Sequence, residues 1–313
     1  MKFKASLRLD TLPYLLGATA ALARMAKMGA GSRSTASALG APICYLKLTP
    51  NQFFLNVRHC DEMEAYIEAE TVALFHPGWV IESKRRNNIG LVVDVLHLHN
   101  TLKLASHCSR ITMKLAKRQG QGVLSFDFTD ALMDNLWITQ DCPVQTLQGE
   151  DVDTAGTPDI PACEWNVEAP RLRLALSVLD RMTRLKADVV TVDVTPTAAA
   201  EGHCELAFAG ASDLVNVKTA FPKCALLVAD TNTKQPTAPH VARSFKTRRL
   251  AAALRVAMDM SHGRTNDGLV ACVIPEDEQA YPWACVVFHS SKLESLKLFC
   301  VLPTLRRPRD DMI

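Results

Sequence analysis

The 313-residue sequence lacks the features that mark several classes of protein. No apolar run approaches the roughly 20 residues of a membrane-spanning helix, so no membrane association is expected. Lys2, Lys4 and Arg8 interrupt any apolar segment near the amino terminus, so no signal peptide is expected either. Aromatic residues make up 6% of the chain, and the net charge is only +2. One large domain or two of about 150 residues are both compatible with this length.

The cysteines lack the spacing of a metal site. Ten are present, but no two form a Cys-x-x-Cys pair. Three of them follow a histidine directly, as in His59–Cys60, His107–Cys108 and His203–Cys204. Adjacent residues on a strand point to opposite faces, so such doublets are poor chelators. We therefore expect buried, reduced thiols in an intracellular protein, without a metal or another cofactor.

No segment matches a catalytic motif. The GAGSRS segment from Gly29 lacks the Lys-Ser/Thr ending of a phosphate-binding loop and follows a predicted helix rather than a strand. The histidines in His97–Asn100 have no acidic or cysteine partner at ligand spacing. Asp151 and Asp153 lie in an acidic linker, where solvation accounts for them. We expect that the protein is not an enzyme; an intracellular enzyme of unknown reaction is the lower-ranked alternative.

What is present is a pattern that occurs twice. Met1–Leu9 alternates apolar with polar residues, which predicts a strand with one buried face. Pro13 suits the first turn of a following amphipathic helix. Cys163–Ala169 alternates in the same way, and Pro170 opens another amphipathic helix. The predicted buried stripe of the first helix is Leu15, Ala18, Leu22 and Met25.

Each half of the chain then continues with several short strands, a second helix and more strands. The second helices are predicted near Leu96–His107 and Phe245–Met260. Short alternating strands joined by tight turns are typical of antiparallel meanders. The sequence therefore predicts an α+β duplication, in which residues 1–146 and 163–305 form similar domains, each with two helices on one face of its antiparallel sheets.

Four further segments are predicted to lack regular structure. Residues 147–162 form an acidic connector between the domains, and residues 306–313 form a flexible tail. Gly29–Pro42 and Ala229–Arg243 are rich in small and polar residues, which is typical of loops.

Positive and negative charge are separated along the chain. Between Gln119 and Pro170 there is no Lys or Arg but ten Asp and Glu, whereas Pro170–Lys186 holds five basic residues and one acidic residue. On the helix after Pro170 the predicted buried stripe is Leu172, Leu176, Leu179 and Met182, and the opposite side carries Arg173, Ser177, Arg181 and Arg184. On the last helix the predicted outward residues are Arg248, Ala252, Arg255 and Asp259, with Lys246 and Arg249 in the first turn.

Cations in a first helical turn oppose the helix macrodipole, which favours a functional reason for them. An ordinary solvated helix face is the alternative for any single helix. The two helices of the first half are weaker versions of this pattern, with Arg24 and Lys27 on one and Lys103 on the other. Four helices with this character favour a common surface for a phosphate backbone, bound through sequence-independent charge. Few aromatic residues accompany these cations, so base-specific or single-strand recognition is not predicted. The predicted DNA-facing residues are Arg24, Lys27, Lys103, Arg173, Arg181, Arg184, Lys246, Arg248 and Arg255.

The doubled order of elements, the basic helices and the acidic connector together resemble the sliding DNA clamps of the proliferating-cell-nuclear-antigen superfamily. Three short segments are most similar to the Hus subunits of the heterotrimeric DNA-damage checkpoint clamp: MKFKA at Met1, NLWITQDCPVQTL at Asn135 and LKLFCVLPTL at Leu296. The resemblance in element order covers nearly the whole chain.

The resemblance implies a nuclear, ring-shaped heterotrimer in which helices line the hole and face double-stranded DNA. Its implied partners are two other clamp subunits, a dedicated clamp loader and repair proteins. Charge separation would then draw the duplex into the hole and keep it off the outer surface. Residues 29–42 and 229–243 look longer than the family's usual connections, and the tail after Leu305 is extra. A homotrimeric replicative clamp and an accessory DNA-binding domain without a ring are the alternatives.

Overall fold

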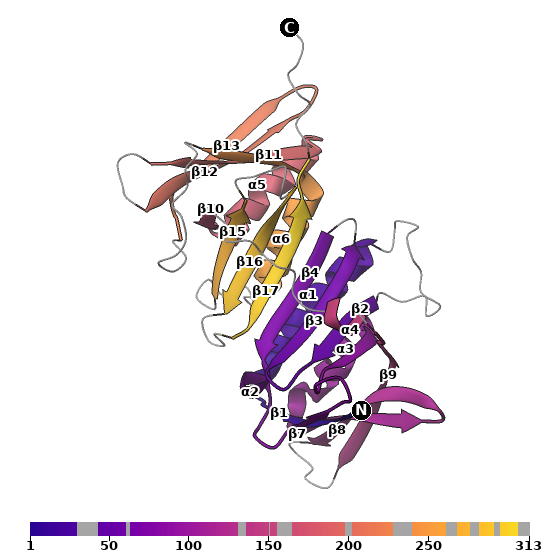
Figure 1. The fold of residues 1–313 in the computed structure, drawn as a ribbon. Coiled ribbons are helices and arrows are strands. Elements are labelled where there is room, and N and C mark those ends of the chain that lie inside the picture. Colours follow the sequence, from indigo (N-terminus) through magenta and orange to yellow (C-terminus); the bar gives the residue numbers. More distant parts are fainter. Residues whose placement is uncertain are drawn as a thin grey trace. The chain divides into compact units, whose positions relative to one another are not determined.

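The computed structural model describes residues 1–29, 43–60, 63–130, 136–149, 151–154, 165–197, 202–227, 240–260, 268–275, 282–290 and 295–305 (Figure 1). The chain divides into two compact units. Unit 1 comprises Met1–Pro158, Asp259–Gly263 and His289–Leu298, and unit 2 comprises Asp159–Met258, Arg264–Phe288 and Phe299–Ile313. The predicted tail and most of both predicted loops lie outside the described residues, and the predicted domain boundaries stay predictions.

Unit 1 follows the predicted order of strand, helix, strands, helix and strands. Its strands are β1 (Lys2–Leu7), β2 (Ile43–Leu48), β3 (Gln52–Cys60), β4 (Met63–Glu70), β5 (Val80–Glu82), β6 (Ile89–Asp94), β7 (Cys108–Arg118), β8 (Gln121–Asp130) and β9 (Trp137–Thr146). Its helical segments are α1 (Leu12–Gly29), α2 (Thr71–Leu74), α3 (Val95–Leu104), η1 (Ala105–His107) and α4 (Asp151–Thr154).

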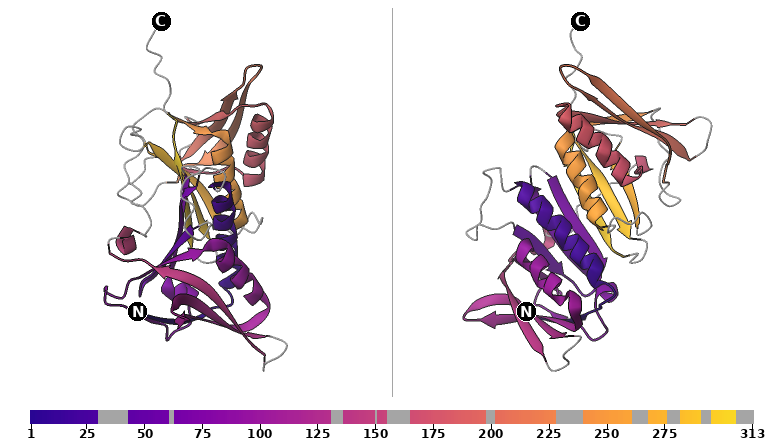
Figure 2. Two further views of the ribbon diagram at one scale, coloured as in Figure 1. Left: turned by 90° about the vertical axis from the view of Figure 1, so that its right-hand side faces the viewer. Right: turned by 180° about the vertical axis from the view of Figure 1, so that it is seen from behind.

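The strands of unit 1 lie in the order β4-β3-β2-β6-β9-β8-β7-β1-β5, and each described pair is antiparallel. The two long helices, α1 and α3, pack side by side on one face (Figure 2). Phe3, Ala5 and Leu7 of β1 are buried, as the alternation of β1 predicts. The stripe of Leu15, Ala18, Leu22 and Met25 on α1 is buried as well, which confirms its predicted orientation.

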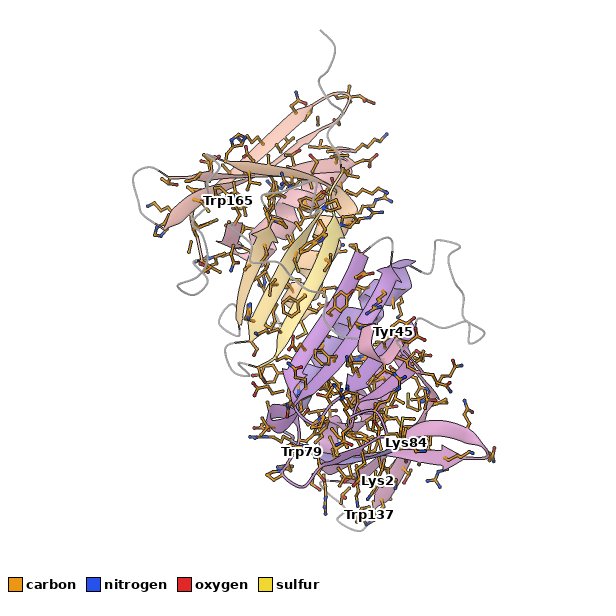
Figure 3. The ribbon with its side chains drawn as sticks, in the orientation of Figure 1. Lys2, Tyr45, Trp79, Lys84, Trp137 and Trp165 are labelled. Atoms are coloured by element: carbon orange, nitrogen blue, oxygen red, sulfur yellow. The ribbon has the colours of Figure 1, made fainter. Side chains whose placement is uncertain are left out.

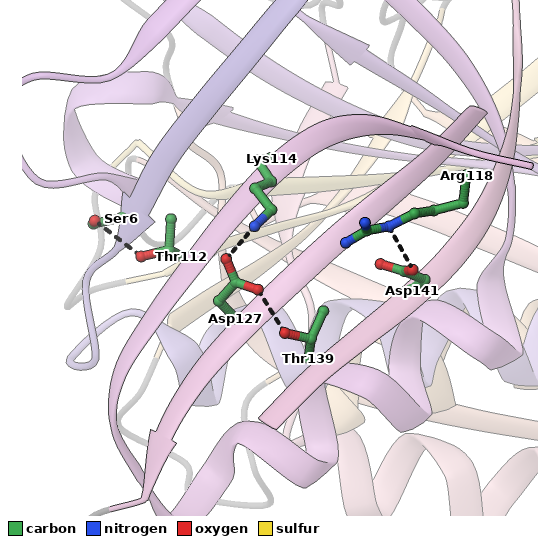
Figure 4. A network of polar contacts seen from close by, with 7 residues as sticks. All are labelled: Ser6, Thr112, Lys114, Arg118, Asp127, Thr139 and Asp141. Carbon is green, nitrogen blue, oxygen red and sulfur yellow. Dashed lines mark hydrogen bonds and ion pairs between the residues drawn. The ribbon is translucent and has the colours of Figure 1, made fainter. Parts of the chain in front are cut away.

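The opposite face of the β7–β8–β9 meander carries polar side chains instead (Figure 4). Lys114 and Arg118 on β7 pair with Asp127 on β8 and Asp141 on β9, respectively. The Thr139 hydroxyl donates to Asp127 at 2.9 Å. Burial raises the pKa of Asp127, but the hydrogen bonds from Lys114 and Thr139 outweigh it and hold the pKa below its ordinary value. This face is therefore stabilised by ion pairs, whereas the other face packs against helices.

Unit 2 repeats the plan. Its strands are β10 (Trp165–Glu168), β11 (Val189–Pro196), β12 (His203–Ala211), β13 (Asn216–Ala225), β14 (Val241–Lys246) and β15 (Gly268–Ile274), together with most of β16 (Trp283–Ser290) and β17 (Lys297–Pro303). Its helices are α5 (Leu172–Arg184) and α6 (Thr247–Met260). The sheets have the orders β13-β12-β11-β14 and β10-β15-β16-β17. Trp165 is fully buried in this unit (Figure 3).

Three details of the two helices in unit 2 differ from the sequence-based prediction. Leu172 is only half-buried, and Ala175 joins Leu176, Leu179 and Met182 in the buried stripe of α5. Lys246 is the last residue of β14 rather than part of the helix. Ala252, predicted to face outward, is buried, since the buried surface of α6 extends around most of the helix.

β9 and β13 are among the strands with a backbone edge that no described strand covers. Among the described residues, Trp137–Pro143 of β9 pair only with β8, and Asn216–Phe221 of β13 pair only with β12. β13 stands at one end of its four-stranded sheet and contains Pro222, which has no backbone N–H. Trp137 is 65% exposed at the start of β9 (Figure 3). Both edges are thus positions at which a further strand can add.

Eight described cysteines are present as thiols rather than in disulfides. Cys108 is partly exposed, and the buried ones are Cys44, Cys142, Cys204, Cys224, Cys272, Cys285 and Cys300. Burial raises the pKa of Cys142, Cys204, Cys272 and Cys300 to about 12. Within the described ranges, no three His, Cys, Asp or Glu residues are placed to hold a metal ion. No helix in these ranges is long and apolar enough to span a membrane.

Candidate nucleic-acid interface

The outward faces of α5 and α6 border a hollow of about 460 Å³, which we call the arginine hollow. The two helices lie beside each other in unit 2 (Figure 2). In the part of the chain that the structure describes, the charged side chains that line the hollow are four arginines and one aspartate. Its lining residues are Arg173, Leu176, Ser177, Asp180, Arg181, Arg184, Arg255 and Met258.

The packing of α5 explains why its arginines reach this hollow. Leu179 and Met182 are fully buried and fix the rotation of the helix. Residues at three- and four-residue spacing share a helix side, so Arg173, Arg181 and Arg184 emerge together. Arg181 and Arg184 lie in the last turn, where the macrodipole favours cations. Arg173 lies in the first turn, where the macrodipole opposes it, so local helix stability does not account for its presence.

One ion pair crosses the hollow. The Arg255 guanidinium on α6 donates a hydrogen bond to the Asp180 carboxylate on α5. The two side chains are 44% and 45% exposed. An exposed pair of this kind contributes about 0–1 kcal/mol to stability. Asp180 therefore matters more for the charge of the hollow than for the stability of unit 2.

The remaining predicted cations of unit 2 lie away from the hollow. Arg248 is exposed on the first turn of α6, and Lys246 is exposed at the end of β14. Arg249, which the sequence also placed in this first turn, is buried, with 2% of its surface exposed. The surface cations that the two helices share around one concavity are thus Arg173, Arg181, Arg184 and Arg255.

In unit 1 the predicted cations Arg24, Lys27 and Lys103 are exposed on α1 and α3. His99 lies between these helices, with its Nδ1 atom 3.1 Å from the Thr19 hydroxyl. Burial, followed by the nearby charges of Lys103 and Lys27, lowers the pKa of His99. His99 is therefore neutral at pH 7 and adds no charge to this face.

A basic turn was missed by sequence reasoning. Lys84 (Figure 3), Arg85 and Arg86 are exposed between β5 and β6. The Ser83 hydroxyl bonds to the Asn88 carbonyl at 2.7 Å, and Arg86 and Asn87 have positive φ angles of 47° and 62°. The signal that could have found it was the run of three basic residues directly before two asparagines, which favour left-handed turn positions.

The described start of the predicted connector is held on unit 1. The Leu147 N–H donates to the Gly90 carbonyl at 2.9 Å, and Val152 is buried. A Cβ atom at Gly90 would lie 3.1 Å from atoms of both residues, so the connector packs directly on the β6 backbone. The Arg85 guanidinium also donates to the Gly149 carbonyl.

Comparisons with known proteins agree with this architecture. The family model described as Hus1-like protein matches residues 1–267. The checkpoint protein hus1 of Schizosaccharomyces pombe is 25% identical over 153 residues, which are 47% of this chain and 52% of the relative. The match thus spans about half the length of that curated relative.

Two solved structures are similar over 97% of this chain. Proliferating cellular nuclear antigen from Entamoeba histolytica has a TM-score of 0.63 at 10% identity and is covered over 99% of its length. PCNA from Thermococcus kodakaraensis has a TM-score of 0.61 at 12% identity and is covered completely, at 100%. At these identities the likeness concerns the fold, and it confirms the duplicated clamp fold predicted from the sequence.

Proposed function

Because the chain belongs to the Hus1-like family, we propose that it is one subunit of a ring-shaped heterotrimeric clamp acting in DNA-damage checkpoint signalling and repair. The name of the fission yeast relative, a checkpoint protein, supports this assignment. We propose a nuclear location, no catalytic step, and double-stranded DNA as a sequence-independent ligand. The observation that carries the DNA-binding part is the arginine hollow between α5 and α6.

The chemistry of the hollow suits a phosphate backbone. Guanidinium groups remain protonated at any physiological pH and match the geometry of phosphate oxygens. Arg181 and Arg184 are exposed, so their contacts with DNA would be solvated and individually weak. Such contacts hold a duplex without reading its sequence, as the helix faces of a clamp require. Arg24, Lys27, Lys103, Lys246 and Arg248 would add further contacts of the same kind.

Assembly with two other clamp subunits is the second part of the proposal. The uncovered edges of β9 and β13 support it, because an open edge can accept a strand from a neighbouring subunit. A ring that closes around DNA also needs a loader to open it, and we propose a dedicated clamp loader as a partner. In the alternative, a homotrimeric replicative clamp, the same edges would join copies of this chain.

The test is charge reversal in the hollow. The test uses one triple variant, which carries Arg173→Glu, Arg181→Glu and Arg184→Glu. Its association with nicked plasmid is measured in the assembled complex across a salt series. We expect strongly reduced association and a salt slope lower by about one unit for each arginine that no longer binds a phosphate. Folding should survive, because these side chains lie opposite the buried stripe of α5.

The matched control reverses three exposed lysines of unit 1 and changes the net charge equally. The control changes Lys2 and Lys4 on β1 and Lys117 on β7 to Glu. We expect this control to keep the wild-type salt slope. Equal retention and equal slopes for wild type and the hollow variant would contradict the proposal, since the hollow would then not meet DNA.

A further inference from the structure

We propose that Asp180 sets the affinity of the arginine hollow for DNA and keeps it low. This inference rests on the proposed function. Among the described residues that line the hollow, Asp180 is the one acidic residue, and four arginines surround it. Its side chain is 45% exposed and borders the space that a phosphate group would enter.

Asp180 opposes phosphate binding in two ways. Its carboxylate accepts a hydrogen bond from the Arg255 guanidinium. A phosphate oxygen that binds Arg255 must therefore displace this carboxylate or share the guanidinium with it. Its charge also repels a phosphate held by the neighbouring arginines. At about 7 Å in water this repulsion corresponds to roughly a threefold change in affinity, and the change grows where the effective dielectric constant is lower.

This arrangement suits a protein that moves along DNA. Four arginines around one concavity, without an acidic neighbour, would hold a phosphate group in place. Sliding requires that each contact with a phosphate be released and replaced by a contact with the next one. A carboxylate inside the hollow offers Arg255 an alternative partner and so lowers the barrier to release.

The neutral, nearly isosteric variant Asp180→Asn tests the inference. Its control is Asp213→Asn, which removes the same charge from an exposed turn between β12 and β13. Affinity for a fluorescent duplex is measured in the assembled complex over a salt series. We expect Asp180→Asn to bind about three- to tenfold more tightly than Asp213→Asn near 0.1 M salt. The conservative variant Asp180→Glu should bind as wild type does.

A double-mutant cycle with Arg255→Gln separates the two contributions. If Asp180 acts partly by occupying Arg255, the gain from Asp180→Asn should shrink when Arg255 is already replaced. Melting curves of each variant show whether unit 2 remains folded. If Asp180→Asn increases the affinity for DNA equally with and without Arg255→Gln, Asp180 acts only by repelling the phosphate. Asp180 would then still lower the affinity of the hollow.

Three results overturn the inference or its basis. Equal affinities of Asp180→Asn and Asp213→Asn would show that only net charge matters. Weaker binding by Asp180→Asn would show that Asp180 positions Arg255 for DNA instead of competing for it. If either of these results came together with a triple arginine reversal that left DNA association unchanged, the proposed function itself would fail. If the reversal weakened association as expected, the proposed function would stand and only the role of Asp180 would be refuted.

Discussion

Replacing Gly90 should release the start of the connector from unit 1. In Gly90→Ala the new Cβ would lie 3.1 Å from Leu147 Cβ, Leu147 Cδ1 and Val152 Cγ2. Carbon atoms pack best at about 3.5–4.0 Å, so the neighbours must retreat. Leu147 is tied by its N–H to the Gly90 carbonyl, and Val152 is 2% exposed, so neither moves without breaking a contact.

The expected cost is that of overpacking, about 1–3 kcal/mol in the free energy of unfolding. For a unit of this size, each kcal/mol shifts the melting temperature by roughly 2–4 °C. Thermal unfolding measures the loss of stability, and limited proteolysis with mapping of the cleavage sites measures exposure of residues 147–154. We expect a lower melting temperature and faster cleavage in this segment.

Gly122→Ala is the matched control on β8. Its Cβ would lie 3.4 Å from the Val144 carbonyl oxygen and 3.7 Å from Val144 Cγ2, which are ordinary contacts. We expect it to change the free energy of unfolding by less than about 0.5 kcal/mol, as surface substitutions generally do. If the two variants melt and cleave alike, close packing on Gly90 does not hold the connector.

Two further predictions concern titratable groups. His99 has a folded pKa below its ordinary 6.5, so the unfolded chain binds more protons, and stability should fall as the pH drops from about 6.5 toward the folded pKa. Chemical denaturation between pH 7.5 and 5.5 should show a smaller decrease for His99→Gln, with part of the decrease remaining because the pKa of His289 is lowered too; an unchanged decrease would contradict the assignment. Of the eight described thiols, Cys108 should react first with iodoacetamide at pH 8, since it is partly exposed and the others are buried. Peptide mass spectrometry measures the order, and early modification of Cys204 or Cys272, whose pKa values are about 12, would refute it.

Sequence periodicity predicted those elements that bury a single face. The alternation of β1 and most of the stripe on α5 were found because each is buried on one side only. For α6 the same reasoning failed, since Arg249 and Ala252 are buried along with the expected stripe. When a helix is buried on more than one side, the apolar pattern of its sequence no longer identifies the residues that face solvent.

The start of α6 depended on contacts far away in the sequence. The Thr247 N–H donates to the Asp188 carbonyl at 2.9 Å, and its hydroxyl donates to the Ala187 carbonyl at 2.6 Å. These contacts join residues about 60 positions apart. Local patterns contain no trace of them, and so the prediction placed Lys246 inside the helix.

The candidate site was predictable in its parts but not as a whole. The exposure of Arg173, Arg181 and Arg184 follows from the stripe on the opposite side of α5. The hollow and the Asp180–Arg255 pair require two helices that approach each other in space, 75 residues apart in sequence. Whether the nine predicted cations face DNA stays a prediction.

Pro222 gives the open edge of β13 a defined end. An edge strand that finds no partner can pair with any exposed strand, which is a route to aggregation. Because Pro222 has no N–H to donate, a strand added alongside Asn216–Phe221 cannot continue its ladder past this residue. Lys218 and Lys223 place charge on either side of this stop. A chain whose β13 edge is uncovered is thereby less able to stack into open-ended sheets with its own copies.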